Sequence, residues 1–287
     1  MIYISDNGSE DNTKQMVDSV IKNNPNMNIY YSKNNKNIGF DRNILKCYDE
    51  CKTDYIWILS DDDKVIGNSI SKIIEQLDKA DVICLNDLSN KSNGLQSEDI
   101  NISLKNENQR WEAISKFVWI SRFVAKKIKI QKESFENYVG TGLMHLAILN
   151  NLFLSKDNCK FTITNYPVLI NQPHCVFSHN FTNVFVNKFY DFCMLPESKF
   201  SKDLALKVAR ANIPFVVNGL LAHKVGSKVF KYDFKFFYLL QKMMKYKCNF
   251  GLILKFLIIY LTPTKLVRII KKTKTPCIEE NEKRTYI

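Results

Sequence analysis

Short apolar runs alternate with amphipathic segments along the first part of the chain. The runs IYI, NIYYS, YIWILS and DVICLN each end in polar or turn-forming residues, as strands of a packed sheet do. Apolar residues recur at helical spacing between these runs, at Met16, Val17, Val20 and Ile21, at Ile44, Leu45 and Tyr48 after a predicted N-cap at Asp41, and at Ile70, Ile73, Ile74 and Leu77. Strands that alternate with helices at such short intervals predict a parallel, doubly wound α/β sheet through about residue 87.

Polar side chains follow three of the predicted strands at the point where each strand ends. They are Asp6, Asn7, Gly8 and Ser9 after the first strand, Ser60, Asp61, Asp62 and Asp63 after the third, and Asn86 and Asp87 after the fourth. Ligands of doubly wound sheets bind outside the carboxyl ends of the strands. We therefore expect these side chains to converge on one crevice.

Beyond residue 87 the pattern is less regular. The polar segment 88–108 is expected to be a loop that separates the first half of the chain from the second. After it, WEAISKFVWISRFVAKK fits a helix that runs into a strand, GTGLMHLAILNNLFL fits a helix, and KFTITNYPVLI fits a strand. These elements predict a second, less regular half.

Composition places the chain among folded proteins, because 45% hydrophobic residues over 287 positions suffice for a sizeable core. The longest apolar stretch, FGLILKFLIIYL, contains Lys255 and is shorter than the roughly 20 residues that cross a bilayer, so no spanning helix and no secretory signal are expected. The eight cysteines include no CxxC pair. We interpret them as reduced thiols of a cytoplasmic protein rather than zinc or disulfide sites.

The positive charge is concentrated near the C-terminus. Residues 224–274 contain thirteen Lys and Arg against one acid, Asp233, so this segment accounts for the whole net charge of +12. Its basic residues alternate with Phe, Tyr, Leu and Ile, as in helices that lie on an anionic membrane. A packed helical subdomain with a solvated basic face is the alternative. Nucleic-acid binding is not expected, since no RNA- or DNA-binding module accompanies the segment.

The stretch WILSDDD is the most informative one for chemistry. Three adjacent carboxylates repel one another and are tolerated only in water or around a cation. Oxygen ligands in this pattern suit Mg²⁺ or Mn²⁺ shared with a diphosphate. A solvated Asp-rich turn that caps the next helix is the alternative for Asp61, Asp62 and Asp63.

The segments IYISDNGSEDNT and NNKNIGFDRNILKCYDECKTDYIWILSDDD, in this order, resemble the nucleotide-sugar-binding half of the family-two glycosyltransferases of GT-A fold. YIWILSDDDKV followed by YVGTGLMHLAIL is similar to the branch that includes abequosyltransferases. The resemblance implies that Asp61 and Asp63 hold Mn²⁺ or Mg²⁺. It implies that the donor nucleotide sugar is bound by Asp6, Asn7, Ser9, Asn37, Gly39, Arg42, Asp61 and Asp62.

The same resemblance implies an architecture: a GT-A-like, doubly wound, mostly parallel sheet with helices on both faces, followed by a basic helical C-terminal tail. We expect a nucleotide-sugar-binding half at 1–100, an acceptor-binding half at 101–223 and the tail at 224–287. Members of the family normally begin with one more strand and helix, which end in a PTYNR-like loop. This sequence starts at what corresponds to the second strand, so we expect it to be short at its N-terminus.

The implied reaction is an inverting displacement at the anomeric carbon of the donor sugar by an acceptor hydroxyl, with a carboxylate as general base. Glu136 is the first candidate for the base, followed by Glu133 and Asp87, although each could be an ordinary surface acid. We expect a saccharide acceptor that is lipid-linked, as in lipopolysaccharide synthesis, and a peripheral enzyme on the cytosolic face of the membrane. The alternative is a truncated, non-catalytic relative that binds a membrane or a partner protein.

The histidines fit structural roles better than metal ligation. His174, Cys175 and His179 lie close together, but their spacing matches no standard zinc site and no second ligand pair accompanies them. His145 follows the GTG sequence on an apolar helix. It is expected either in the core or facing the acceptor.

Overall fold

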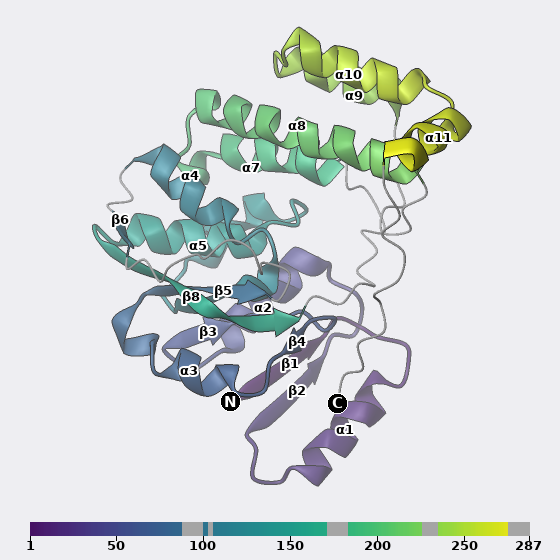
Figure 1. The fold of residues 1–287 in the computed structure, drawn as a ribbon. Helices are drawn as coiled ribbons and strands as arrows, with labels where there is room; N and C mark the ends of the chain where they lie inside the picture. Colours follow the sequence, from purple (N-terminus) through teal and green to yellow (C-terminus); the bar gives the residue numbers. More distant parts are fainter. Residues whose placement is uncertain (88–99, 103–105, 171–182, 226–234, 275–287) are drawn as a thin grey trace. The chain divides into compact units, whose positions relative to one another are not determined.

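A computed structural model describes residues 1–87, 100–102, 106–170, 183–225 and 235–274 (Figure 1). The chain forms two compact units. The first unit contains residues 1–173 and 188–205, and the second contains residues 174–187 and 206–287. All described strands belong to the first unit, and the described part of the second unit is helical.

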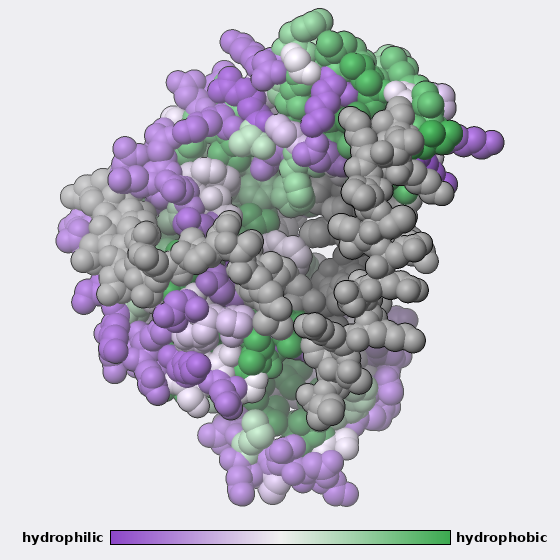
Figure 2. All heavy atoms as spheres, viewed as in Figure 1, coloured by the Kyte–Doolittle hydropathy of each residue, from purple (hydrophilic) through white to green (hydrophobic). Residues whose placement is uncertain are grey.

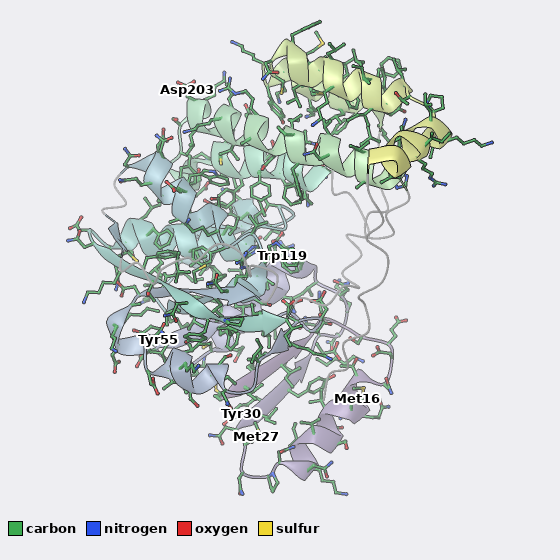
Figure 3. The ribbon with its side chains drawn as sticks, in the orientation of Figure 1. Met16, Met27, Tyr30, Tyr55, Trp119 and Asp203 are labelled. Carbon is green, nitrogen blue, oxygen red and sulfur yellow. The ribbon has the colours of Figure 1, made fainter. Side chains whose placement is uncertain are left out.

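A small parallel sheet opens the first unit. Strands β1 (Ile2–Asp6) and β2 (Ile29–Lys33) pair from Ile2 with Ile29 to Asp6 with Lys33, and α1 (Thr13–Asn23) connects them. None of the residues of α1, all of which the structure describes, is buried. Met16, Met27 and Tyr30 lie at the surface of this part (Figure 3). We call β1, α1 and β2 the N-terminal layer.

A six-stranded sheet forms the centre of the first unit, with strand order β3-β7-β5-β8-β4 and with β6 also paired to β8. Its strands are β3 (Tyr55–Trp57), β4 (Lys64–Val65), β5 (Val82–Asp87), β6 (Ile100–Ile102), β7 (Phe123–Lys126) and β8 (Cys159–Ile170). We call it the central sheet.

The α/β pattern of the first half agrees with the sequence prediction, but the central sheet is mixed instead of mostly parallel. Strand β7 lies between β3 and β5 and is antiparallel to both, while β5 and β8 are parallel. The alternation of strands and helices through residue 87 cannot predict that β7, which comes later in the chain, lies between β3 and β5.

Helices cover both faces of the central sheet (Figure 1). On one face, Ile73 of α3 packs with Ile83, Leu85 and Val124. On the other face, the Phe117 ring contacts the rings of Phe123 and Phe161. Besides α1, the first unit contains the helices α2 (Phe40–Glu50), α3 (Ser69–Ile74), α4 (Glu107–Ser115), α5 (Met144–Ser155) and α7 (Phe189–Met194). Short helical turns lie along the chain at Leu77–Lys79, Ile120–Arg122, Lys132–Tyr138, Val184–Lys188 and Pro196–Ser198.

The second unit contains most of α8 (Lys202–Lys224), together with α9 (Phe236–Lys245), α10 (Phe250–Leu261) and α11 (Thr264–Lys274). Among the described residues, α8 is the one helix that is long and apolar enough to cross a membrane, although the sequence predicted none. Half of its apolar window is buried, as in the core helix of a soluble protein, which passes the same test. Length and apolar composition therefore do not make α8 a membrane span.

Candidate active site at the carboxyl ends of the strands

Asp6 is the buried last residue of β1 and is held as a carboxylate. The Tyr31 hydroxyl donates to its Oδ2 over 2.5 Å, and the Ser9 amide donates to its Oδ1 over 2.7 Å. Burial raises the pKa of Asp6, but the hydrogen bonds from Tyr31 and Ser9 and the charge of Lys33 outweigh it, so the pKa falls to about 2. The bond to Asp6 raises the pKa of Tyr31 to about 12. The pair therefore provides a fixed negative charge at neutral pH.

A network of amide side chains joins the loop after β1 to the loop after β2. Asn7 Oδ1 accepts from Asn34 Nδ2 and from the Ile38 amide, and Asn7 Nδ2 donates to Asn37 Oδ1 over 2.9 Å. Asn37 Oδ1 also accepts from the Gly39 amide, which precedes α2. The structure thus brings Asn7, Asn37 and Gly39 together, and their role in binding a nucleotide stays a prediction.

Gly8 allows this close approach of the two loops. Its φ is 86°, and a Cβ built at this position would lie 2.9 Å from the Asn37 amide nitrogen and from the Lys36 carbonyl carbon. Any side chain there would push the two loops apart. Gly8 therefore helps to position the network although it has no side chain that could form a hydrogen bond.

Arg42 of α2 and Glu136 are brought together from positions 94 residues apart. Arg42 Nη2 donates to Glu136 Oε2 over 2.9 Å, and both side chains are exposed. A donor-binding candidate and the first candidate for the general base therefore form one ion pair. Glu133 belongs to the same helical turn (Lys132–Tyr138).

Asp41 was predicted as the N-cap of α2, and this prediction is wrong. The helix begins at Phe40 after Gly39, and the buried Asp41 carboxylate instead accepts three backbone hydrogen bonds from the GTG segment. The donors are the amides of Gly140 and Gly142 at 2.7 and 2.9 Å and that of Met144, the first residue of α5, at 3.2 Å. Asp41 thus fixes α2 against the segment that follows Glu136.

The aspartate cluster occupies the turn after β3. Asp61 and Asp62 are exposed, Asp63 is half-buried, and Ser60 Oγ donates to Asp62 Oδ1 over 2.5 Å. The Ser60 amide donates to Ser121 Oγ, which fixes the start of the turn. Asp87 is the last residue of β5, so both groups lie at carboxyl ends of parallel strands of the central sheet.

The donor chemistry of this turn fits a hard divalent cation. Within the described residues, no group of three or more His, Cys, Asp and Glu side chains is arranged to hold a metal ion. Mg²⁺ is commonly held by one or two carboxylates, with the substrate phosphates and water completing its shell. Asp61 and Asp63 could supply such a partial set, and a ligand diphosphate would supply the rest.

His145 lies in the core of the first unit. Its ring is buried, and Nε2 lies 3.2 Å from the Val118 carbonyl oxygen. Burial lowers the pKa of His145 to about 4 despite the nearby carbonyl groups, so the ring is neutral at pH 7. This location supports the core alternative. His174, Cys175 and His179 lie outside the described residues.

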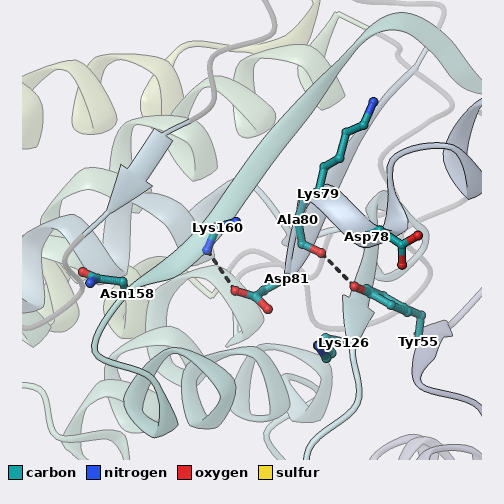
Figure 4. A pocket seen from close by; sticks show the side chains of 8 residues that line it. All are labelled: Tyr55, Asp78, Lys79, Ala80, Asp81, Lys126, Asn158 and Lys160. Carbon is teal, nitrogen blue, oxygen red and sulfur yellow. Dashed lines mark hydrogen bonds between the residues drawn. The ribbon is translucent and has the colours of Figure 1, made fainter.

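A pocket of about 490 Å³ lies at the other end of the central sheet (Figure 4). Tyr55 starts β3, Asp81 precedes β5, Lys126 ends the antiparallel β7, and Lys160 is near the start of β8. Asp81 is bound by Lys156 at 2.5 Å and by the Lys160 amide at 3.0 Å. This pocket is therefore separate from the carboxyl-end aspartates and does not serve as their donor site.

The predicted residues thus fall into two groups. Asp6, Asn7, Ser9, Asn37 and Gly39 form one connected network, and Arg42 on the adjoining helix holds Glu136. Asp61, Asp62, Asp63 and Asp87 lie at the ends of β3 and β5. Sequence reasoning missed the contributions of Tyr31, Asn34 and Asp41, because each acts through a partner at least 25 residues away. Their local sequences contain no signal for these partners.

Comparison with known proteins identifies the family and the fold. Residues 1–151 match the profile of the family Glycosyl transferase family 2. The chain is 27% identical over 278 residues to "Abequosyltransferase RfbV" of Salmonella typhimurium, which covers 88% of this chain and 81% of that protein. The crystal structure of S. aureus TarS 1-349 aligns with a TM-score of 0.52 and 9% identity, over 95% of this chain and 81% of that chain. This likeness shows the fold alone, and it confirms the predicted GT-A-like α/β class.

Proposed function

The chain belongs to glycosyl transferase family 2, and we propose that it moves a sugar from a nucleoside-diphosphate sugar to a saccharide acceptor during surface polysaccharide synthesis. The observation that carries the proposal is the position of the family match. All candidates for donor binding, metal binding and the general base lie within residues 1–151. The similarity to an abequosyltransferase supports a deoxygenated hexose as the donor sugar.

In this proposal, the network around Asp6 binds the nucleoside. Asp6 stays ionised at neutral pH and offers an acceptor for ribose hydroxyls or base N–H groups, while Asn7 and Asn37 hold the two loops around the ligand. A bound Mn²⁺ or Mg²⁺ would offset the negative charge that develops on the departing diphosphate. Asp61 and Asp63 would hold this cation, and Asp62 would contact the donor.

Glu136 accepts the proton from the attacking acceptor hydroxyl in this proposal, and the displacement inverts the anomeric carbon. The ion pair with Arg42 fixes the direction of the carboxylate, and Asp41 fixes the segment that follows it. Asp87 is the second candidate for the base. The acceptor is a lipid-linked saccharide, and the enzyme acts on the cytosolic face of an anionic membrane, which it contacts through residues 224–274. The excess of Lys and Arg in that segment supports this location.

The donor site is tested by calorimetric titration with a panel of nucleoside diphosphates, with and without Mn²⁺. We expect metal-dependent binding of one or few members of the panel, and loss of this binding in the Asp61→Ala, Asp63→Ala double variant. Asp18→Ala is the matched control, because Asp18 is an exposed aspartate of α1 paired with Lys14. Equal binding by the double variant would contradict the metal site and favour a non-catalytic relative.

The general base is tested by kinetics on the donor that the titration identifies. Glu136→Gln should lower kcat by roughly 100- to 10,000-fold with little change in KM, as expected for loss of a proton acceptor. Glu112→Gln, at an exposed glutamate of α4, is the matched control and should leave kcat nearly unchanged. Loss of activity in Asp87→Asn but not in Glu136→Gln would assign the base to Asp87. Product anomeric configuration, measured by NMR, tests inversion.

A further inference from the structure

Helix α10 of the second unit is apolar on both of its faces. Towards the interior of the unit, Phe256 and Ile259 are buried, and the Phe256 ring stacks on Phe236 of α9 with 5.5 Å between centroids. Lys255 is its one charged residue, and Lys255 Nζ donates to Asn218 Oδ1 of α8 over 2.9 Å. One face of the helix is therefore packed against the rest of the second unit.

The opposite face of α10 exposes large apolar side chains in a row. Phe250 is 77% exposed, Leu254 43%, Ile258 58% and Leu261 71%. Their spacing of four, four and three residues places them along one side of the helix. We call these four residues the outer stripe. Hydrophobic residues gather over this part of the surface in Figure 2.

An apolar row of this kind is unfavourable in water. Soluble monomers rarely expose contiguous apolar patches, and larger ones mark interaction sites. The fold does not leave α10 loose, because Lys224 Nζ donates to the carbonyl oxygens of Tyr260 and Thr262 and so caps its C-terminus. Arg268 of α11 donates in turn to the Lys224 carbonyl oxygen at 3.3 Å. The outer stripe is thus presented by a braced helix, which indicates a binding surface.

The charges around the outer stripe indicate what covers it. Between residues 235 and 274 the sequence contains no acid, and the described basic side chains of α9, α10, α11 and their connections are Lys235, Lys242, Lys245, Lys247, Lys255, Lys265 and Arg268. A second copy of the chain would bring an equally basic surface against this one, with repulsion between like charges. Anionic lipid headgroups match the lysines, and acyl chains match the apolar residues between them.

We propose that the outer stripe of α10 inserts into the boundary between headgroups and acyl chains of an anionic bilayer, while the surrounding lysines other than Lys255 contact lipid phosphates. This inference deepens the proposed function, since it rests on the proposal that the enzyme works at a membrane. It identifies one helix and four side chains as the membrane contact. It also assigns Lys224 and Lys255 to bracing α10 rather than to binding lipid.

The test measures partition of the full-length protein onto vesicles of phosphatidylglycerol and phosphatidylcholine, by flotation. We expect the Phe250→Ser, Leu261→Ser double variant to bind at least tenfold more weakly than the wild type. The matched control is Met16→Ser, Val20→Ser on α1, which removes two exposed apolar side chains of the first unit and should bind as the wild type does. Pure phosphatidylcholine vesicles and high salt should each weaken wild-type binding.

Two further measurements test whether the double variant is still folded and whether position 250 enters the bilayer. Thermal unfolding followed by circular dichroism should be unchanged in the double variant, because both side chains are exposed. Phe250→Trp should show a blue shift of its fluorescence when anionic vesicles are added, whereas Met16→Trp should not. If the stripe variant floats like the wild type, the proposal is overturned. A wild-type dimer that the stripe variant converts to a monomer would also overturn it, since a second copy would then cover α10.

Failure of this inference is distinguishable from failure of the proposed function. Nucleoside-diphosphate binding is measured without vesicles, and the stripe variant should retain it fully. Donor binding without flotation would overturn the outer stripe and leave the transferase proposal intact. Flotation without binding of any nucleoside diphosphate would overturn the transferase proposal and leave the membrane contact of the outer stripe intact.

Discussion

The N-terminal layer and the central sheet are built from the same kind of sequence but are held together by different interactions. Both have short apolar strands that alternate with amphipathic helices. In the central sheet, helices on both faces bury Ile83, Leu85 and Phe161 almost completely. In the N-terminal layer, α1 has no buried residue, and hydrogen bonds link Asp6 to Tyr31 and the loop amides to one another. Apolar pattern alone therefore does not create a core; a second covering layer must also be present.

The largest effect should come from removing a ring in the central sheet. Phe161→Ala should lower the free energy of unfolding by about 3–5 kcal/mol, because a buried ring in contact with Phe117 is replaced by a cavity. Tyr30→Ala is the matched control, since Tyr30 is an exposed aromatic residue on β2. Urea unfolding measures both. Similar losses in the two variants would remove the distinction between the two regions.

The second-largest loss of stability should come from removing the hydrogen bonds between Asp41 of α2 and the GTG segment. Asp41→Ala should lower the free energy of unfolding by about 1–3 kcal/mol, because three backbone amides lose their acceptor in a buried place. Asp41→Asn should cost less, since its amide oxygen can still accept from some of these groups. The same urea titration measures the effect, and an Asp41→Ala variant as stable as the wild type would refute it.

A pH dependence should mark the polar network of the N-terminal layer. The pKa of Asp6 is about 2 in the folded protein against an ordinary 3.8, so its carboxylate stabilises the fold above about pH 4. This contribution is lost as pH falls through 2. The stability difference between wild type and Asp6→Asn, measured by denaturation from pH 5 to pH 2, should therefore shrink. Tyr31→Phe removes a hydrogen bond and should move the loss to higher pH.

The smallest effect should come from the apolar residues of α1. Val20→Ser should change the free energy of unfolding by less than about 0.5 kcal/mol, because the side chain is exposed and loses no buried contact. The difference between the Val20→Ser and Phe161→Ala losses in the free energy of unfolding then measures how far the two regions differ. A loss above about 1 kcal/mol would mean that Val20 is covered in solution.

Several features of the site could be predicted from the sequence because they are local. Asp61, Asp62 and Asp63 come directly after an apolar run, and the loop residues Asn37 and Gly39 immediately precede a helical pattern. Strand and helix positions through residue 87 result from periodicities of two and 3.6, which depend only on neighbours in the chain. The family resemblance then implied the donor residues, and the match over residues 1–151 confirms the family. The assignment of individual residues stays a prediction. The expected boundaries between the two halves and the tail, at residues 100 and 223, stay predictions.

Features that depend on distant partners could not be predicted. The antiparallel β7 between β3 and β5, the pairing of Arg42 with Glu136 and the use of Asp41 as an acceptor for Gly140 all join residues from separate elements. The cost of burying a carboxylate and its compensation by three amides 99 to 103 residues away appear only when the chain is folded.

Residues that are close in the chain were enough to predict the α/β class, the order of the first strands and helices, and the acidic turn after β3. Which apolar surfaces are covered depends instead on how the elements pack in the folded protein. Phe161 and Phe250 are both large and apolar, yet one lies in the core of the central sheet and the other on the outer stripe of α10. Burial depends on what packs against a side chain, and that partner is set by the three-dimensional arrangement of the elements.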